Sequence, residues 1–372
     1  PGELHGACRG ACNKWLGNGR LRSCEGVGGE IPVAMYDMAK WGIYWNYVAD
    51  KFDLRPHIRL DSRVMSAVFD EDDDRWLVQL EDGHQARGRF LITSVGILSA
   101  GYTPDFDGID SFKGPWCHTG RWPKEGMDLA GKRVGVIGTG ATGVQLITEI
   151  AKEVAHLTVF QRTANFCAPL RNGPIDDEAQ REIKASYPEI FAKCMATAGS
   201  FMHEFDPRSA MEVSPEERLE QYERLWAEPG FKKWLSNFYD VMMPGEANED
   251  YAEFFRNKIR ERVHDPLVAE MLVPKDHMFG SKRLPCESGY YEVYNQDNVL
   301  LVDVRQAPIE QITPTGLKTS DAEYDLDVII FATGFDAVTG SLNRLDIRGI
   351  GGQSLKDKFA GGPRTYMGIS SA

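Results

Sequence analysis

The sequence predicts an α/β protein, and three observations support this fold class. Residues 133–160 alternate strand, glycine-rich turn, helix and strand, which is the start of a β-α-β unit. Residues 176–271 are polar and charged with helical spacing, which is typical of a helical insertion. Strand patterns then return at 299–302 and 326–333, so the α/β domain is expected to continue after the insertion.

The elements of this unit follow from their apolar periodicity. A strand is expected at Arg133–Ile137, a helix at Gly143–Lys152 and a second strand at Leu157–Phe160. Within the insertion, five aromatic side chains are expected to be buried: Trp226, Trp234, Phe238, Phe254 and Phe255.

The first hundred residues predict a smaller β-rich region. Residues 35–52 have helical spacing, whereas 58–68, 76–80 and 88–92 alternate as strands between acidic turns. This pattern predicts a small antiparallel meander. The apolar run 90–95 is expected to lead from the meander back to a core.

Composition excludes several classes of protein. The 372 residues suffice for two domains, and 42% hydrophobic with 26% charged residues is typical of a globular protein. A net charge of −13 argues against a nucleic-acid partner. No apolar run approaches the roughly 18 residues that span a bilayer, and no secretory signal is evident. We therefore expect a cytoplasmic monomer with neither a membrane nor a nucleic-acid partner.

The seven cysteines are scattered and include no C-x-x-C pair. Cys8, Cys12 and Cys24 cluster near His5, which is a possible metal site. Their spacing matches no usual zinc pattern, so we expect free thiols and no metal ion.

A G-x-G-x-x-G motif stands between the first predicted strand and the helix. Its six residues are Gly138, Thr139, Gly140, Ala141, Thr142 and Gly143. Gly138 permits a tight turn, Gly140 lets the backbone approach a pyrophosphate, and Gly143 lets helix and strand pack closely. The backbone N–H groups at the helix start would face the phosphates. A plain glycine-rich turn is the alternative, but the strand before and the helix after favour dinucleotide binding.

The residues at the end of the next predicted strand indicate which dinucleotide binds. An NAD site would place Asp or Glu there to bond the ribose 2′-hydroxyl. This chain has Arg162 and Thr163 instead, a guanidinium and a hydroxyl that suit a 2′-phosphate. An arginine in a surface loop is the alternative. The sequence therefore predicts NADPH.

The segment before this unit fits the pattern F-x-G-x-x-x-H-T-x-x-W-P. Its fixed positions are Phe112, Gly114, His118, Thr119, Trp122 and Pro123. In this pattern the chain strongly resembles the Baeyer–Villiger monooxygenases, and the resemblance extends from about residue 35 to the C-terminus. His118 alone would be interpreted as a core or interdomain histidine. In the family it belongs to the linker and couples domain motion, so it is assigned no chemical role.

The resemblance also assigns roles to Lys282 and Arg283. A Lys-Arg pair in a loop is usually solvated. In the family, the arginine at this place stabilises the anionic peroxyflavin and the tetrahedral adduct, while the lysine reaches the NADP 2′-phosphate. The chemistry requires a permanent cation beside a developing oxyanion. Arg283 is therefore predicted to be catalytic and Lys282 to bind the cofactor.

The resemblance implies two dinucleotide-binding (Rossmann-like) domains, of which the FAD domain is split. Residues Ala332–Gly334, with Gly96 as an earlier counterpart, match the family's crossings between domains, where small residues would permit a hinge. The expected parts are a partial FAD-binding domain at 1–111, a fingerprint linker at 112–130, an NADP-binding domain at 131–330 with its helical insertion at about 176–271, and a return to the FAD-binding domain at 331–372.

The implied function is a flavin monooxygenase that uses FAD, NADPH and O₂ to convert ketones to esters or lactones. The family's first G-x-G-x-x-G, for FAD, has no match before residue 30. Two alternatives stay open: a flavin monooxygenase that oxygenates nitrogen or sulfur, and a non-catalytic NADP-binding fragment.

Overall fold

The computed structural model describes residues 38–171, 173, 175–197 and 200–366. These residues form two compact units. The first comprises residues 42–103 and 334–366, and the second consists chiefly of residues 104–333. No helix in the described ranges is long and apolar enough to cross a membrane. Cys8, Cys12, Cys24 and His5 lie outside the described residues, while Cys117, Cys167, Cys194 and Cys286 are free cysteines.

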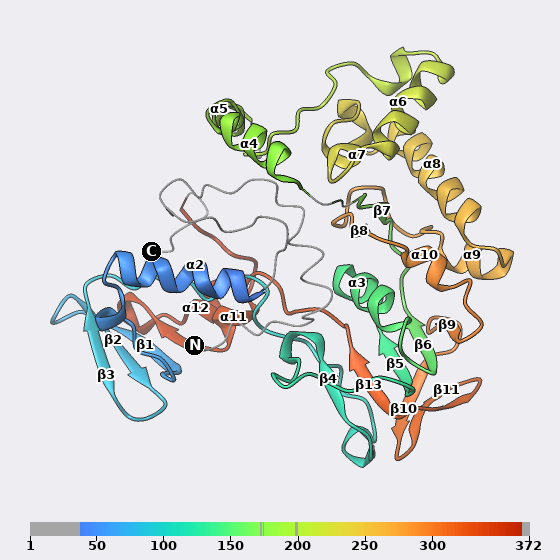
Figure 1. The fold of residues 1–372 in the computed structure, drawn as a ribbon. Helices are drawn as coiled ribbons and strands as arrows, with labels where there is room; N and C mark the ends of the chain where they lie inside the picture. Colours follow the sequence, from blue (N-terminus) through green and yellow to red (C-terminus); the bar gives the residue numbers. More distant parts are fainter. Residues whose placement is uncertain (1–37, 172, 174, 198–199, 367–372) are drawn as a thin grey trace. The chain divides into compact units, whose positions relative to one another are not determined.

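The second unit is built on a five-stranded parallel sheet with the order β4-β13-β5-β6-β9 (Figure 1). Its strands are β4 (Trp116–His118), β5 (Arg133–Ile137), β6 (His156–Gln161), β9 (Val299–Asp303) and β13 (Val328–Phe331). The central strands β5 and β13 are almost entirely apolar because both of their faces are buried. Helix α3 (Ala141–Ile150) follows β5 and packs on the sheet core. The predicted β-α-β unit and the α/β fold class are confirmed.

The insertion between β6 and β9 is helical, as predicted. Its helices are α4 (Asp177–Ala185), α5 (Tyr187–Ala196), α6 (Pro215–Ala227), α7 (Lys232–Leu235), α8 (Glu246–Arg262) and α9 (Pro266–Leu272). Side chains of Asp176, Ser214 and Asp265 accept backbone N–H groups and so begin α4, α6 and α9. Four predicted anchors are buried, Trp226, Phe238, Phe254 and Phe255. Trp234 is only partly buried at the edge of the same cluster.

Short elements complete the second unit. Strands β7 (Ala168–Pro169) and β8 (Cys286–Glu287) pair with each other, and α10 (Tyr290–Val293) follows β8. A three-stranded antiparallel sheet contains β10 (Ile309–Thr313), β11 (Gly316–Thr319) and β12 (Glu323–Asp325).

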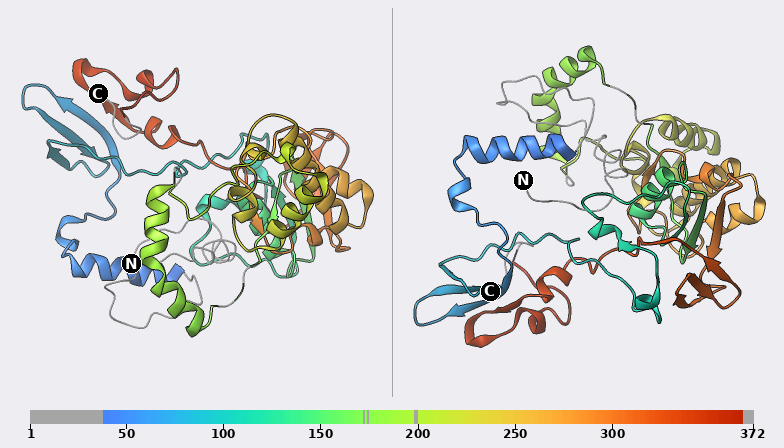
Figure 2. Two further views of the ribbon diagram at one scale, coloured as in Figure 1. Left: turned by 90° about the horizontal axis from the view of Figure 1, so that it is seen from above. Right: turned by 60° about the horizontal axis from the view of Figure 1, so that its bottom comes forward.

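The first unit contains the predicted antiparallel meander. Its strands are β1 (Val64–Asp70), β2 (Arg75–Leu80) and β3 (Gln85–Gly88), and β14 (Asp346–Arg348) adds a parallel strand beside β1. Figure 2 shows the red C-terminal segment lying along the blue meander. Three helices complete the described part of this region, α2 (Met38–Lys51), α11 (Gly340–Asn343) and α12 (Leu355–Lys358).

Two expectations for this unit are wrong. The first strand begins at Val64 rather than at residue 58, and the third ends at Gly88 rather than at residue 92. The run 90–95 does not enter a core, because Phe90 and Ile92 are 80% and 85% exposed. An apolar run is buried only where other layers cover it. No strand in the described ranges pairs with residues 89–95.

Candidate functional site

The glycine-rich turn follows β5 directly and shows three different steric environments. Gly138 has a φ of +109°, and a Cβ there would lie 2.6 Å from the carbonyl oxygen of Ala332. A Cβ on Gly143 would overlap the carbonyl oxygen of Gly138. A Cβ on Gly140 would meet no protein atom within 4 Å. Packing within the protein therefore requires glycine at the first and third positions, while the second faces open space.

Helix α3 begins at this open position. Gly140 is its N-cap residue, and no side chain caps the first turn. The partly buried Ala141 and Thr142 open the helix. Such N–H groups, together with the positive end of the helix dipole, form a site for an anion. The buried Thr139 donates its hydroxyl to the carbonyl oxygen of Thr163 (2.9 Å), which ties the turn to the end of β6.

A cavity of about 270 Å³ lies at the carboxyl ends of β6 and β9, and Arg162 and Thr163 line it. In open parallel sheets this edge is where ligands bind. Arg162 is exposed, and no hydrogen bond or ion pair joins it to any residue that the structure describes. Two other cations of the cavity are paired, since Lys275 contacts Glu270 (2.7 Å) and Arg305 contacts Asp276 (2.5 Å). Among these three cations, Arg162 is therefore the one whose charge no described residue offsets.

Lys282 and Arg283 are exposed and lie in the loop before β8, separated from it by Leu284 and Pro285. Desolvation by the surrounding protein lowers the pKa of the Arg283 guanidinium from its high normal value, and the Cys286 thiol opposes this shift. Strand β8 and helix α10 both pack against α3. The strand that follows the Lys282–Arg283 loop therefore packs against the helix that starts at the glycine turn.

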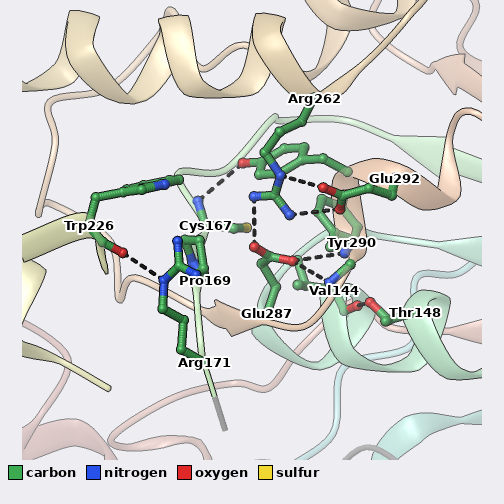
Figure 3. A network of polar contacts seen from close by, with 12 residues as sticks. Val144, Thr148, Cys167, Pro169, Arg171, Trp226, Arg262, Glu287, Tyr290 and Glu292 are labelled. Atoms are coloured by element: carbon green, nitrogen blue, oxygen red, sulfur yellow. Dashed lines mark hydrogen bonds and ion pairs between the residues drawn. The ribbon is translucent and has the colours of Figure 1, made fainter. Parts of the chain in front are cut away.

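A buried carboxylate anchors the turn that follows β8 (Figure 3). The side chain of Glu287 is fully buried. It accepts hydrogen bonds from Arg262 (2.8 Å) and from the N–H groups of Gly289 (2.7 Å) and Tyr290 (2.9 Å). Arg262 also binds Glu292 through two nitrogens, at 2.6 and 2.7 Å. One carboxylate therefore joins the end of α8 to the turn between β8 and α10.

The fingerprint segment forms part of the second unit. Its residues 116–118 are strand β4, paired with β13 at the sheet edge. Phe112, His118 and Thr119 are buried, and Trp122 packs against the sheet core. His118 accepts the N–H of Gly120 at Nδ1 (3.0 Å). A Cβ on Gly114 would overlap the carbonyl oxygen of Asp327, and the carbonyl oxygen of Pro123 accepts the N–H of Gly126 (3.0 Å), so these two positions shape the loops around the strand.

Comparisons with known proteins agree with this geometry. The family of flavin-binding monooxygenase-like proteins matches residues 30–169. The crystal structure of OTEMO in complex with FAD and NADP has a TM-score of 0.90 and 47% identity, and the match covers 97% of this chain and 69% of that one. The chain belongs to the Baeyer–Villiger monooxygenases.

Two curated relatives are similar over 88% of the chain. They are the 2-oxo-Delta(3)-4,5,5-trimethylcyclopentenylacetyl-CoA monooxygenase of Pseudomonas putida, 50% identical, and a Baeyer–Villiger monooxygenase of Pseudooceanicola batsensis, 44% identical. The chain spans 61% and 60% of their lengths.

Of the residues that line the cavity, sequence reasoning named only Arg162 and Thr163. It missed polar ones such as Gln161, Asp276 and Arg305. Gln161 donates its amide to the carbonyl oxygen of Met271 (2.7 Å), and its Oε1 has no hydrogen-bond partner within the described part of the chain. Arg305 could have been found by the rule that found Arg162, because it follows the end of the neighbouring parallel strand β9. Asp276 lies in a loop and carries no comparable signal.

The segments that follow Gly96 and Gly334, one from each predicted crossing, are hydrogen-bonded to each other in the first unit. The N–H of Tyr102 donates to the carbonyl oxygen of Gly334 (3.0 Å), and that of Asp336 to Ala100 (2.8 Å). Gly96 and Gly334 both have positive φ, at +73° and +84°. Glycine supplies these left-handed conformations without strain.

Proposed function

We propose that this chain carries the NADPH-binding part of a flavin monooxygenase that converts ketones to esters or lactones with NADPH and O₂. One observation carries the proposal above all. A relative that is 50% identical over 88% of the chain is named for the oxygenation of a 2-oxo-cyclopentenyl compound, a cyclic ketone. The proposed partners are a small ketone and O₂, for a monomer in the cytoplasm.

The described residues fit NADPH. The pyrophosphate would lie on the turn Gly138–Gly143, where Gly140 leaves space and the α3 N–H groups are uncapped by side chains. Arg162 and Thr163 would bind the 2′-phosphate at the end of β6, and Lys282 is proposed as a further ligand. FAD is proposed from the similarity to the flavin-binding relatives.

When bound, the flavin and the nicotinamide supply the redox chemistry and the activation of O₂. In balance, a ketone, O₂, NADPH and a proton give an ester, NADP⁺ and water. One oxygen atom is inserted between the carbonyl carbon and its neighbour, and the other leaves as water. Arg283 would place a permanent cation beside the oxygen on which negative charge develops. The buried Glu287 holds the backbone that follows Arg283 in place.

Product analysis tests the proposal. The purified chain is supplied with FAD, NADPH, cyclopentanone and isotopically labelled O₂, and an organic sulfide is offered in parallel. We expect a lactone that carries one labelled oxygen. Sulfoxide without lactone would favour sulfur oxygenation instead. NADPH binding by a colourless protein, without the flavin band at about 450 nm, would identify a non-catalytic fragment.

Two arginine variants test the role of Arg283. Arg283→Ala removes the cation and is expected to lower lactone formation by about 100-fold or more. Its affinity for NADPH should change little, because the proposed nucleotide contacts lie elsewhere. Arg283→Lys keeps the charge but not the planar fork, so it should retain part of the activity. Full turnover in Arg283→Ala would refute the catalytic role.

A glycine variant tests the nucleotide site without catalysis. Gly140→Ala adds a methyl group where the structure has open space, so folding should be nearly unaffected. NADPH affinity, measured by calorimetry, should fall about tenfold or more because the methyl group would occupy the approach of the pyrophosphate. Gly349→Ala is the matched control, since its Cβ also meets nothing within 4 Å but lies in the first unit.

A further inference from the structure

The cavity contains an ion pair that the proposed function does not use. Nη2 of Arg305 donates to Asp276 Oδ2 (2.5 Å) and to Thr163 Oγ1 (2.9 Å). All three residues line the cavity, as Arg162 does. One guanidinium nitrogen therefore contacts both an acid and the threonine that is proposed to bind the 2′-phosphate.

Asp276 remains an anion under working conditions. Its Oδ1 contacts Nδ1 of His277 (2.7 Å), and its side chain is 33% exposed. The hydrogen bond from His277, reinforced by Arg305, lowers the pKa of Asp276 to about 2. Because His277 is a second partner, the carboxylate would keep a hydrogen bond if Arg305 turned toward a ligand.

Arg305 retains the capacity to bind a further anion. A guanidinium has five N–H donors, and those on Nε and Nη1 make no hydrogen bond to any residue in the described ranges. The side chain is 51% exposed at the cavity. The obstacle to a phosphate is electrostatic, because the Asp276 carboxylate offsets the charge of Arg305.

Building on the proposed NADPH site, we propose that Asp276 is a built-in anionic competitor that holds down the affinity for 2′-phosphorylated nucleotides by offsetting the charge of Arg305. Arg305 is then a second cation for the 2′-phosphate, beside Arg162. A nucleotide without the 2′-phosphate is insensitive to this pair. Asp276 thus reduces the selectivity for NADPH over NADH below what the two arginines alone would give.

Binding measurements on three variants test this inference. Asp276→Asn keeps the side-chain shape and removes the charge, so NADPH should bind about 3- to 10-fold more tightly while NADH changes less than about twofold. Arg305→Gln should weaken NADPH binding about tenfold and leave NADH unchanged. The double variant should behave like Arg305→Gln, because Asp276 acts only through that arginine. Adenosine 2′-phosphate and adenosine 5′-phosphate, titrated by calorimetry, separate the phosphate from the rest of the nucleotide.

Glu270→Gln is the matched control. Glu270 lines the same cavity and carries the same charge, but it pairs with Lys275 (2.7 Å) and Arg260 (2.6 Å). The NADPH affinity of the Glu270→Gln variant should stay within about twofold of that of the wild type. An equal gain in Glu270→Gln, or a gain by Asp276→Asn that persists without Arg305, would overturn the inference. Weaker NADPH binding in Asp276→Asn would also overturn it, since Asp276 would then orient Arg305. A wild-type chain that binds neither nucleotide would instead refute the proposed function.

Discussion

Two arginine–carboxylate groups in the second unit differ in burial and in how their charges are satisfied. The Arg262 side chain is 19% exposed and contacts two carboxylates, one of which, Glu287, is completely buried. Arg305 is 51% exposed at a cavity and contacts one carboxylate. It lines this cavity together with Arg162, which pairs with no residue that the structure describes. A buried charge must be compensated within the protein because water cannot reach it, whereas a cation at a cavity edge can be left for a ligand. Burial and compensation together distinguish a structural arginine from a binding one.

The largest expected effect concerns the buried group. Glu287→Ala leaves Arg262 without one partner and leaves the N–H groups of Gly289 and Tyr290 without an acceptor. We expect the free energy of unfolding to fall by about 3–5 kcal/mol, measured by urea denaturation. Glu287→Gln keeps an acceptor for the N–H groups and should cost less.

The control for this prediction is an exposed ion pair. Glu310→Gln breaks the contact with Lys318 (2.7 Å) and should cost less than about 1 kcal/mol. If Glu287→Ala and Glu310→Gln lowered the free energy of unfolding by similar amounts, burial would not determine how much a paired carboxylate contributes to stability.

A buried lysine gives the next effect, which depends on pH. Lys233 is fully buried and donates to the carbonyl oxygens of Pro169 (2.9 Å), Glu228 (2.6 Å) and Gly230 (3.2 Å). Desolvation lowers its pKa from 10.5 to about 8. Between these values the unfolded chain binds more protons than the folded one, so stability rises with pH.

Comparison with Lys233→Met isolates the contribution of Lys233 to the pH dependence of the unfolding free energy. Relative to the variant, the wild type should gain roughly 2 kcal/mol of unfolding free energy between about pH 7 and about pH 9.5. The urea midpoints of both proteins across this range measure the difference. A difference that stays constant with pH would show that the carbonyl oxygens keep the lysine charged throughout.

The sequence predicted those elements whose periodicity reflects burial. Strand β5 and the turn Gly138–Gly143 were found because a strand buried on both faces is a continuous apolar run and because glycine is sterically required at two positions. The two-residue strands β7 and β8 have no periodicity, since pairing between distant segments alone creates them. The prediction for the run 90–95 was wrong because an apolar composition does not show whether another layer of the protein covers the segment.

The site was predictable where it follows a strand and unpredictable where it depends on tertiary contacts. Arg162 follows β6, and in a dinucleotide-binding unit the residue at this distance from the glycine turn indicates whether the ribose carries a 2′-phosphate. Glu287 gave no signal, because an isolated glutamate is normally exposed. Its burial depends on the charge of Arg262, which comes from a helix distant in the sequence. Asp276 gave none for the same reason, since its partner Arg305 follows a different element.

The smallest expected effect concerns Arg162, which has no ion-pair partner within the described part of the chain. Arg162→Gln breaks no ion pair with a described residue, so the free energy of unfolding should change by less than about 0.5 kcal/mol. NADPH binding should nevertheless weaken about tenfold, or about 1.4 kcal/mol, while NADH binding stays nearly constant. Arg59→Gln serves as the control, since Arg59 pairs with Asp82 (2.8 Å) in the first unit and should affect neither nucleotide. Equal losses for NADPH and NADH would mean that Arg162 contacts the part that both nucleotides share. The uncompensated charge would then serve the pyrophosphate or the adenine instead of the 2′-phosphate.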